Sequence, residues 1–258
     1  MFSLKDKVVF ITGASSGIGA ATAHAFASTQ AKLLLCARRA DRLAQLRSAL
    51  LAAGAPAVHT FSLDVRNAKA VSGTLASLPP EWRSIDVLVN NAGLSRGMTK
   101  LYQDDLENWE EMIDTNVKGL LYVTRAVVPG MVERGSGHVV NLGSTAGRMV
   151  YPNGAVYCAT KAAELAISQG LKQDLLGTPV RVTSIDPGMV ETEFSKVRFR
   201  GDEERAAKVY QGVTPLQPED VADAILWAVT RPAHVNIHEV VMTTIDQANS
   251  YLFNRKPQ

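Results

Sequence analysis

The chain alternates short apolar runs with longer helical stretches, and this alternation restricts its fold more than any other feature. We expect seven strands, at residues 7–12, 32–37, 58–63, 86–90, 138–142, 181–186 and 239–244. We expect helices at residues 17–28, 41–53, 67–77, 105–134, 155–176 and 218–230. Such alternation is typical of β–α units around a parallel sheet, and near-continuous apolar strands indicate that both faces are covered. The sequence therefore predicts an α/β fold with a doubly wound parallel sheet of about seven strands.

Residues 193–212 interrupt the alternation, because they are charged and aromatic and have little strand character. We expect an insertion there that covers a binding site as a lid and contains one helix from about residue 202 to residue 210. The sequence shows no internal repeat, low-complexity tract or linker, and 258 residues are enough for one core. We therefore predict a single domain, residues 1–258, that includes the lid.

Composition excludes several classes of partner. The formal charge is only +2 and acidic and basic residues are interspersed, so we expect neither a nucleic-acid nor a membrane partner. No apolar run approaches membrane-spanning length, and the N-terminus lacks a secretory apolar region. The two cysteines, Cys36 and Cys158, have no metal-ligand spacing and suggest reduced thiols. We expect a cytoplasmic protein without a metal site.

A glycine-rich turn follows the first strand, with the segment Thr-Gly-Ala-Ser-Ser-Gly-Ile-Gly at residues 12–19. Its spacing differs from G-x-G-x-x-G, but it lies in the same strand–turn–helix setting. Glycine lets the backbone approach a phosphate, and the amides at the start of the helix point toward it. The turn predicts a Rossmann-type dinucleotide site, and its candidate residues are Gly13, Ser15, Ser16, Gly17, Ile18 and Gly19.

The end of the second strand indicates which dinucleotide is bound. A carboxylate usually holds the free ribose 2′-hydroxyl there, whereas this chain has Arg38 and Arg39. Guanidinium groups hold a 2′-phosphate by charge-assisted hydrogen bonds, so NADP(H) is the expected cofactor. The alternative is that Arg39, with Arg42, only begins a surface helix.

Tyr157 and Lys161 lie four residues apart in an expected helix and so share a face. The ammonium group of Lys161 can then stabilise the Tyr157 phenolate and make the tyrosine a usable acid or base. Ser144 lies upstream as a hydrogen-bond donor for a developing oxyanion. Together with the dinucleotide turn, these residues predict hydride transfer.

The order of these motifs resembles the short-chain dehydrogenase/reductase family from residue 7 to about residue 192. The resemblance implies the catalytic residues Asn116, Ser144, Tyr157 and Lys161. It implies that Lys161 also holds the nicotinamide ribose, and that Asn116 kinks its helix and supports a water relay to Lys161. It further implies cofactor contacts from Asp64, Val65, Asn90, Ala92, Gly93, Pro187, Gly188, Val190 and Thr192.

The substrate is less constrained by the fold, since one fold carries many carbonyl substrates. Arg148, Arg198 and Arg200 follow motifs near the expected catalytic mouth, and an arginine fork suits a carboxylate. The chain is similar to the NADP-dependent 3-hydroxy acid dehydrogenase branch, which includes serine and L-allo-threonine dehydrogenases and malonic semialdehyde reductases. We therefore expect a small-molecule carboxylate substrate bound by these arginines and Ser144. Each arginine has the alternative role of a surface or subunit-interface ion pair.

Three other functions remain open from sequence. One is a reductase of neutral ketones, aldehydes or 3-oxoacyl thioesters, another is a sulfoacetaldehyde reductase, and the third is a non-catalytic NADP sensor. The family resemblance also implies a homotetramer, with the helices at 105–134 and 155–176 as the interface. The tail at residues 246–258 is expected to pack on a neighbouring subunit.

Overall fold

The sheet has seven parallel strands in the order β3-β2-β1-β4-β5-β6-β7 in the computed structural model, which describes residues 3–256. Its strands are β1 (Val8–Thr12), β2 (Lys32–Ala37), β3 (Ala57–Ser62), β4 (Ile85–Asn90), β5 (Gly137–Leu142), β6 (Val180–Pro187) and β7 (Glu239–Met242). The predicted α/β class is confirmed, and the predicted strands all occur within two residues of their expected ends. The β7 strand is shorter than predicted, because its pairing with β6 ends where Met242 faces Pro187.

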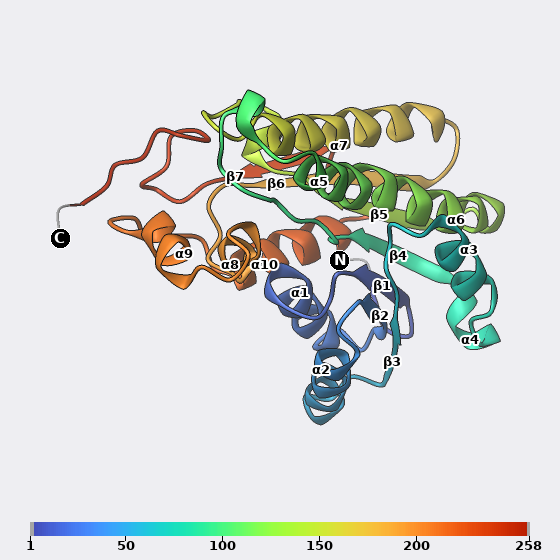
Figure 1. Ribbon diagram of the computed structural model, residues 1–258. Coiled ribbons are helices and arrows are strands. Elements are labelled where there is room, and N and C mark those ends of the chain that lie inside the picture. The colour runs from blue at the N-terminus through green and yellow to red at the C-terminus, as the bar shows by residue number, and fades with distance from the viewer. Residues whose placement is uncertain (1–2, 257–258) are drawn as a thin grey trace.

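Helices cover both faces of the sheet (Figure 1). One face carries α1 (Gly17–Ala27), α2 (Ala40–Ala52) and α10 (Pro218–Val229), which share a core with β1 and β2. The other carries α3 (Ala68–Ala76), α6 (Leu120–Arg134) and α7 (Ala155–Asp174). A short helix, α4 (Pro80–Arg83), was not predicted; a proline begins it and Trp82 anchors it in the second core.

Strand order fixes where a ligand can bind. The chain runs outward from β1 to β2 and β3 on one side, and from β1 to β4 and onward on the other. In open parallel sheets a crevice forms at the carboxyl ends of the strands where this order reverses. The segments after β1 and β4 therefore face each other across that crevice.

The helix predicted at residues 105–134 consists of three segments. They are α5 (Leu106–Met112), a π-helical turn, η2 (Ile113–Gly119), and α6. Within η2, Asn116 hydrogen-bonds to both backbone groups of Leu94, at 2.8 Å each, instead of lying on a helix surface. Single π turns inside α-helices are frequently found at functional sites. The predicted distortion at Asn116 is therefore present, as a π turn.

The insertion at residues 193–212 contains two helices where one was predicted, α8 (Phe194–Arg198) and α9 (Glu203–Tyr210). The second follows Asp202, whose carboxylate accepts the backbone N–H of Arg205 at 3.0 Å. The C-terminal tail lies on the side of α9 (Figure 1), where Arg255 donates to the Val209 carbonyl at 3.1 Å and the Lys256 backbone N–H donates to the Gly212 carbonyl at 2.8 Å. The tail thus packs on the insertion of its own chain; positions 257–258 of the predicted tail, like residues 1–2, lie outside the described residues.

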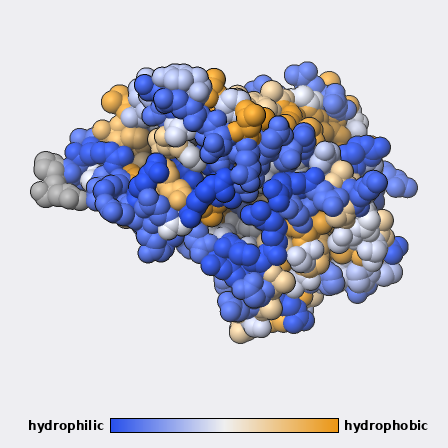
Figure 2. All heavy atoms as spheres, in the orientation of Figure 1, coloured by the Kyte–Doolittle hydropathy of each residue, from blue (hydrophilic) through white to orange (hydrophobic). Residues whose placement is uncertain are grey.

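The visible face of the molecule is mostly hydrophilic, with apolar atoms in separate patches (Figure 2). Among the described residues, no helix is both long enough and apolar enough to cross a membrane.

Candidate active site

Two adjoining cavities open at the carboxyl ends of the strands. The first, of about 330 Å³, follows the crevice between the segments after β1 and β4. The second, of about 600 Å³, lies under α8, α9 and the C-terminal tail. Both volumes are in the range of small-molecule sites. The two cavities share the wall residues Ser144, Tyr157, Gly188, Val190 and Phe194.

The glycine turn forms the floor of the first cavity. Gly13 has φ +65°, and a Cβ atom there would lie 2.8 Å from the Cα atom of Ala92. Gly17 has φ +52° and lies against Thr192, with 3.2 Å between its hypothetical Cβ and the threonine methyl group. Side chains at these positions would fill the crevice or strain the backbone. The turn therefore leaves a backbone-lined cradle at the start of α1, as a dinucleotide requires.

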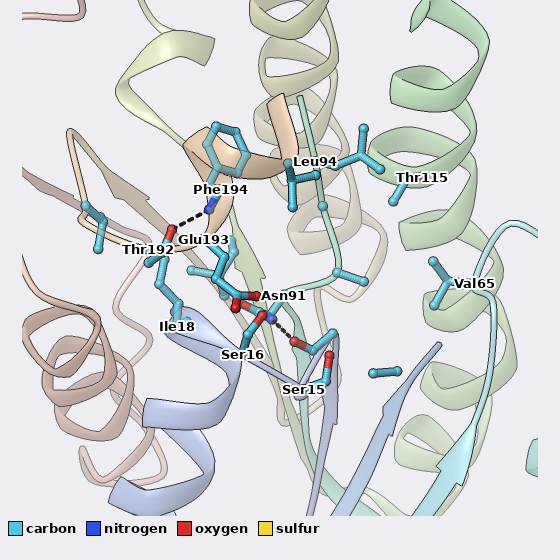
Figure 3. Close-up of a pocket in the computed structure, with 18 of the residues that line it drawn as sticks. Ser15, Ser16, Ile18, Val65, Asn91, Leu94, Thr115, Thr192, Glu193 and Phe194 are labelled. Atoms are coloured by element: carbon cyan, nitrogen blue, oxygen red, sulfur yellow. Dashed lines mark hydrogen bonds between the residues drawn. The ribbon is translucent and has the colours of Figure 1, made fainter. Parts of the chain in front are cut away.

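Most of the predicted cofactor residues line this cavity. Figure 3 shows Ser15, Ser16 and Ile18 at the start of α1, Thr192 and Phe194 on the facing segment, and Val65 across the cavity. The predicted residues in its wall are Gly13, Ser15, Ser16, Gly17, Ile18, Arg38, Arg39, Asp64, Val65, Ala92, Gly93, Ser144, Tyr157, Lys161, Pro187, Gly188, Val190 and Thr192.

Two predicted cofactor residues do not line the cavity. The amide of Asn90 is buried and donates to Asn141 at 2.9 Å and to Thr124 at 3.0 Å, so its side chain joins β4 to β5 and α6. Gly19 lies beneath the turn, where a Cβ atom would be 2.5 Å from the Nδ2 atom of Asn91. Asn90 and Gly19 thus lie behind the lining of the cavity, where Asn91 forms part of the wall, and their predicted cofactor contacts stay predictions.

A basic cluster closes the β2 end of the first cavity. The guanidinium of Arg39 donates to Ser15 at 3.0 Å and to Ser16 at 2.7 Å. It also donates at 3.0 Å to Glu193, which in turn accepts from Arg42 at 2.7 Å. Hydrogen bonding from Arg42, followed by that from Arg39, lowers the pKa of Glu193. Sequence reasoning missed Glu193, whose carboxylate occupies part of the expected anion site.

The expected catalytic residues meet between the two cavities. Tyr157 is buried in the first turns of α7, and its ring centroid lies 5.6 Å from that of Phe194 and 5.9 Å from the Lys161 ammonium. Ser144 follows β5, and its hydroxyl accepts the backbone N–H of Ala146 at 3.1 Å. The α7 helix and the end of β5 thus bring Ser144, Tyr157 and Lys161 into one wall, as their spacing predicted.

A second buried charge lies beside Lys161. Its ammonium donates to the Leu142 carbonyl at 2.8 Å and to the two carboxylate oxygens of Glu164 at 2.8 and 3.1 Å. Burial raises the pKa of Glu164 to about 7, although the charge of Lys161 opposes that rise. Sequence reasoning missed Glu164; its position one turn after Lys161 was the available signal.

Asn116 does not line the cavity but lies directly behind its wall. Its amide nitrogen also donates to Thr160 at 3.0 Å, and its oxygen lies behind Gly93. The neighbouring residue Thr115 does line the cavity (Figure 3), and its buried hydroxyl has no hydrogen-bond partner among the described residues. Buried polar atoms are nearly always paired, so this hydroxyl fits a site that takes a polar ligand.

Arg198 is the one predicted substrate arginine that reaches the second cavity. It is 9% exposed, and its guanidinium carbon lies 5.4 Å from the ring centroid of Tyr157 and 5.0 Å from that of Phe194. It donates to the Tyr151 hydroxyl at 3.0 Å, while its Nε is buried without a partner among the described residues. A buried guanidinium with an unused donor is suited to an anion.

The other two predicted substrate arginines, Arg148 and Arg200, lie outside the lining of both cavities. Arg148 is paired with the buried carboxylate of Asp186 at 2.6 Å and with Glu239, behind the site. Arg200 points to Asn108, whose Oδ1 accepts at 2.8 Å, and its backbone has φ +50°. Neither lines either cavity, because each already has a partner on a neighbouring segment.

The tail supplies wall residues of the second cavity that sequence reasoning missed. They are Gln247, Ser250, Tyr251, Leu252, Phe253 and Arg255. The Ser250 hydroxyl donates at 2.9 Å to the carbonyl of Thr145, which follows Ser144. The available signal in the sequence was the run Tyr251, Leu252 and Phe253 before a polar end, which indicates a tail that packs on other residues.

The chain was compared with known proteins. The family model described as short chain dehydrogenase matches residues 7–203. The chain is 50% identical over 242 residues to the NADP-dependent 3-hydroxy acid dehydrogenase YdfG of Salmonella typhi, covering 93% of this chain and 96% of that protein. It is 46% identical over 242 residues to sulfoacetaldehyde reductase 2 of Chromohalobacter salexigens, covering 93% and 95%.

Solved structures are similar over nearly the whole chain. The closed form of a serine dehydrogenase complexed with NADP⁺ superposes with a TM-score of 0.91 at 48% identity, covering 97% of this chain and all of that one. Serine dehydrogenase from Escherichia coli superposes with a TM-score of 0.81 at 44% identity, covering 93% and 99%. With its sheet order, its glycine turn and Ser144, Tyr157 and Lys161 in one wall, the chain belongs to the short-chain dehydrogenase family of oxidoreductases.

Proposed function

We propose that this protein is an NADP(H)-dependent oxidoreductase that transfers hydride between nicotinamide and C3 of a small 3-hydroxy acid or its 3-oxo partner. The observation that carries the substrate class is Arg198, a buried guanidinium over the Tyr157 ring whose Nε has no partner among the described residues. The similarity to NADP-dependent 3-hydroxy acid and serine dehydrogenases supports the same substrate class.

The first cavity fits the cofactor. The cradle at Gly13 and Gly17 would hold the pyrophosphate, and Arg38 and Arg39 at the end of β2 would hold the 2′-phosphate. Asp64 and Val65 would lie at the adenine, and Val190 and Thr192 at the nicotinamide end. When bound, the cofactor supplies or accepts the hydride at nicotinamide C4.

Tyr157 is the proposed acid and base. In reduction its hydroxyl gives a proton to the carbonyl oxygen while the Ser144 hydroxyl donates a hydrogen bond to the same oxygen. Lys161 stabilises the phenolate that remains, from 5.9 Å of the ring centroid. Asn116 holds Leu94 and Thr160, and so positions the wall in front of Lys161; the water relay through Asn116 stays a prediction.

Arg198 orients the acid. Its guanidinium lies over the ring of Tyr157, so a carboxylate bound to it places a carbon two bonds away near the phenol. A two-point clamp of this kind aligns the reacting carbon for hydride transfer. The helices α8 and α9 would act as the lid, since both contribute to the cavity wall.

A sulfonate substrate is the second candidate, and the relation to a sulfoacetaldehyde reductase favours it. An arginine fork binds either anion. A reductase of neutral ketones or 3-oxoacyl thioesters is less favoured, because it would leave a buried charge without a ligand. A sensor without turnover is less favoured because Ser144, Tyr157 and Lys161 share one wall.

The test follows NADP⁺ reduction with L-serine, L-allo-threonine, 3-hydroxypropionate, isethionate and 2-butanol, and repeats each with NAD⁺. We expect activity with NADP⁺ on the carboxylic acids and little on 2-butanol. Activity confined to isethionate would select the sulfonate candidate. Activity confined to 2-butanol, or to NAD⁺, would contradict the proposal.

Assembly as a homotetramer is part of the proposal. Apolar side chains remain exposed along α5, η2 and α6: Leu106 at 67%, Ile113 at 37%, Leu121 at 42% and Val132 at 40%. Such a stripe is typical of a protein–protein interface. A monomeric mass in sedimentation equilibrium would contradict this part.

A cytoplasmic location is also part of the proposal, since both described cysteines are free and buried.

A further inference from the structure

Glu164 is a buried carboxylate that the proposed mechanism does not use. It lies one turn after Lys161 on the same face of α7. The side chains of Lys161 and Glu164 are 8% and 3% exposed, and the ammonium lies 2.8 and 3.1 Å from the two carboxylate oxygens. The pair is therefore shielded from solvent and held by two short contacts.

Stability alone does not account for such a pair. Removing two charges from water costs about as much as their attraction returns, and apolar residues of similar size are often as stable. Buried, perturbed ionisable groups cluster at functional sites. Here Lys161 lies in the wall of the first cavity together with Tyr157 and Ser144, and Glu164 lies behind it.

Contacts of the ammonium limit what it can do. An ammonium group has three N–H donors. One goes to the carbonyl of Leu142 at 2.8 Å, and the Glu164 carboxylate takes at least one more. At most one donor remains for a hydroxyl in the cavity. Glu164 and the end of β5 thus fix where Lys161 points.

The charges around Glu164 come from three elements. Lys161 and Tyr157 lie on α7, and Asp186 on β6 acts on both members of the pair. Asp186 is itself paired with Arg148, which also contacts Glu239 of β7. Because Arg148 compensates Asp186, the carboxylate of Glu164 is the nearest partner that offsets the Lys161 charge.

We propose that Glu164 is a positioning residue that acts on Tyr157 through Lys161: its carboxylate holds the ammonium against Leu142 and offsets part of its charge. A Tyr157 phenolate is stabilised by Lys161 on α7 and by Arg198 on α8, whose charges lie 5.9 and 5.4 Å from the ring centroid, and is opposed by Glu164. Glu164 thereby sets the pH at which Tyr157 changes between its acid and base forms. The inference rests on the proposed role of Tyr157.

The test measures the pH at which Tyr157 ionises, in a titration that needs no turnover. The cofactor-free enzyme is titrated by the ultraviolet absorption of tyrosinate, and the same titration of a Tyr157→Phe background is subtracted. In Glu164→Gln, the Tyr157 signal is expected about one pH unit lower than in the wild type. Glu164→Asp keeps the charge but is one methylene shorter, so its midpoint should lie between the two.

Ser168→Ala is the matched control, because Ser168 is buried on the same helix and its hydroxyl donates to the Glu164 backbone carbonyl at 2.8 Å. It should leave the Tyr157 midpoint in place, whatever it does to thermal stability. Should Glu164→Gln not fold, Glu164→Asp against the wild type carries the test.

A midpoint that is unchanged or higher in the folded Glu164 variants, or one that moves further in Asp than in Gln, would overturn the inference. The proposed function is judged separately, by turnover of the wild type on the substrate panel. A shifted Tyr157 midpoint in an enzyme without turnover would reject the proposed function and keep the inference. Turnover of the wild type with an unshifted midpoint in the Glu164 variants would keep the proposed function and reject the inference.

Discussion

The two cavities that meet at Tyr157 are built from different parts of the chain. Backbone near the carboxyl ends of the strands forms much of the first, including the glycine turn after β1 and the segments after β4 and β6. In the second, α8, α9 and the C-terminal tail supply half of the wall residues. One site is therefore fixed by the sheet, and the other depends on segments that sequence changes can alter without disturbing the sheet.

Their arginines differ in the same way. Arg39 and its partner Glu193 are each 39% exposed, so water screens them. Arg198 is 9% exposed and packs on the Tyr157 ring. Removing a buried charge contact costs more than removing an exposed one. We therefore expect substitutions at the junction of the two cavities and in the second cavity to change activity more than substitutions at the β2 end of the first cavity.

Tyr157→Phe tests the junction itself and should have the largest effect. Without its hydroxyl the site lacks the proton donor, and turnover should fall about 10³-fold. NADPH affinity, measured by fluorescence titration, should stay within about twofold, since the ring remains in the wall. Tyr210→Phe, which removes another tyrosine hydroxyl from the wall of the second cavity, is the control. Loss of NADPH binding in Tyr157→Phe would indicate a structural role instead.

Arg198→Met tests whether the second cavity recognises an anion. We expect kcat/KM for the carboxylic acids to fall about 100-fold, because the carboxylate loses a buried charged partner. Activity on 2-butanol should not fall. Arg200→Met, two residues away and directed at Asn108, should change neither value by more than about twofold. Equal losses on acids and on the neutral alcohol would mean that Arg198 only supports the lid.

Arg38→Glu tests the opposite end of the first cavity. A carboxylate there should repel a 2′-phosphate, so NADPH affinity should fall about 10- to 30-fold while NADH affinity changes little. Arg47→Glu, in the helix α2 that follows Arg38 and bonded to the carbonyl of Val58, is the matched charge control. If NADPH and NADH weaken equally, Arg38 does not recognise the 2′-phosphate.

Glu193→Gln should have the smallest effect. It frees Arg39 and Arg42 from an exposed ion pair, so NADPH should bind up to about fivefold more tightly and NADH unchanged. Arg42 and Arg39 lower the pKa of Glu193 below the ordinary glutamate value of 4.5, so its carboxylate is ionised at any pH above 4.5. The ion pairs with Arg39 and Arg42 are lost only as the pH falls below that value. The gain in NADPH affinity should therefore be present at every pH from 5 upward. An equal gain in NADH affinity would mean that Glu193 does not act at the 2′-phosphate site.

The sequence predicted the residues of the first cavity better than those of the second. Gly13 and Gly17 follow a strand directly, and Tyr157 and Lys161 share a helix face, so local spacing fixes their positions. The position of Arg148 depends instead on Asp186 and Glu239, which lie far along the chain. No local pattern encodes such pairings.

Contacts between distant segments also explain most of the other differences between the sequence analysis and the structure. Asn90 ends a strand as predicted, but its amide turns away to join Asn141. Glu193 became visible only when Arg39 and Arg42 came close to it in space, whereas Glu164 lies one turn after Lys161 and was overlooked in the sequence. The π turn at Asn116 likewise depends on the backbone of Leu94, a residue from another segment.

The tail that walls the second cavity has a practical consequence for protein engineering. Because Tyr251, Leu252 and Phe253 line the cavity, variants of these residues can be screened for altered substrate range while the sheet is left untouched. An affinity tag fused after them would be anchored beside the pocket, so the N-terminal side is the safer place for purification handles and for immobilisation on a support.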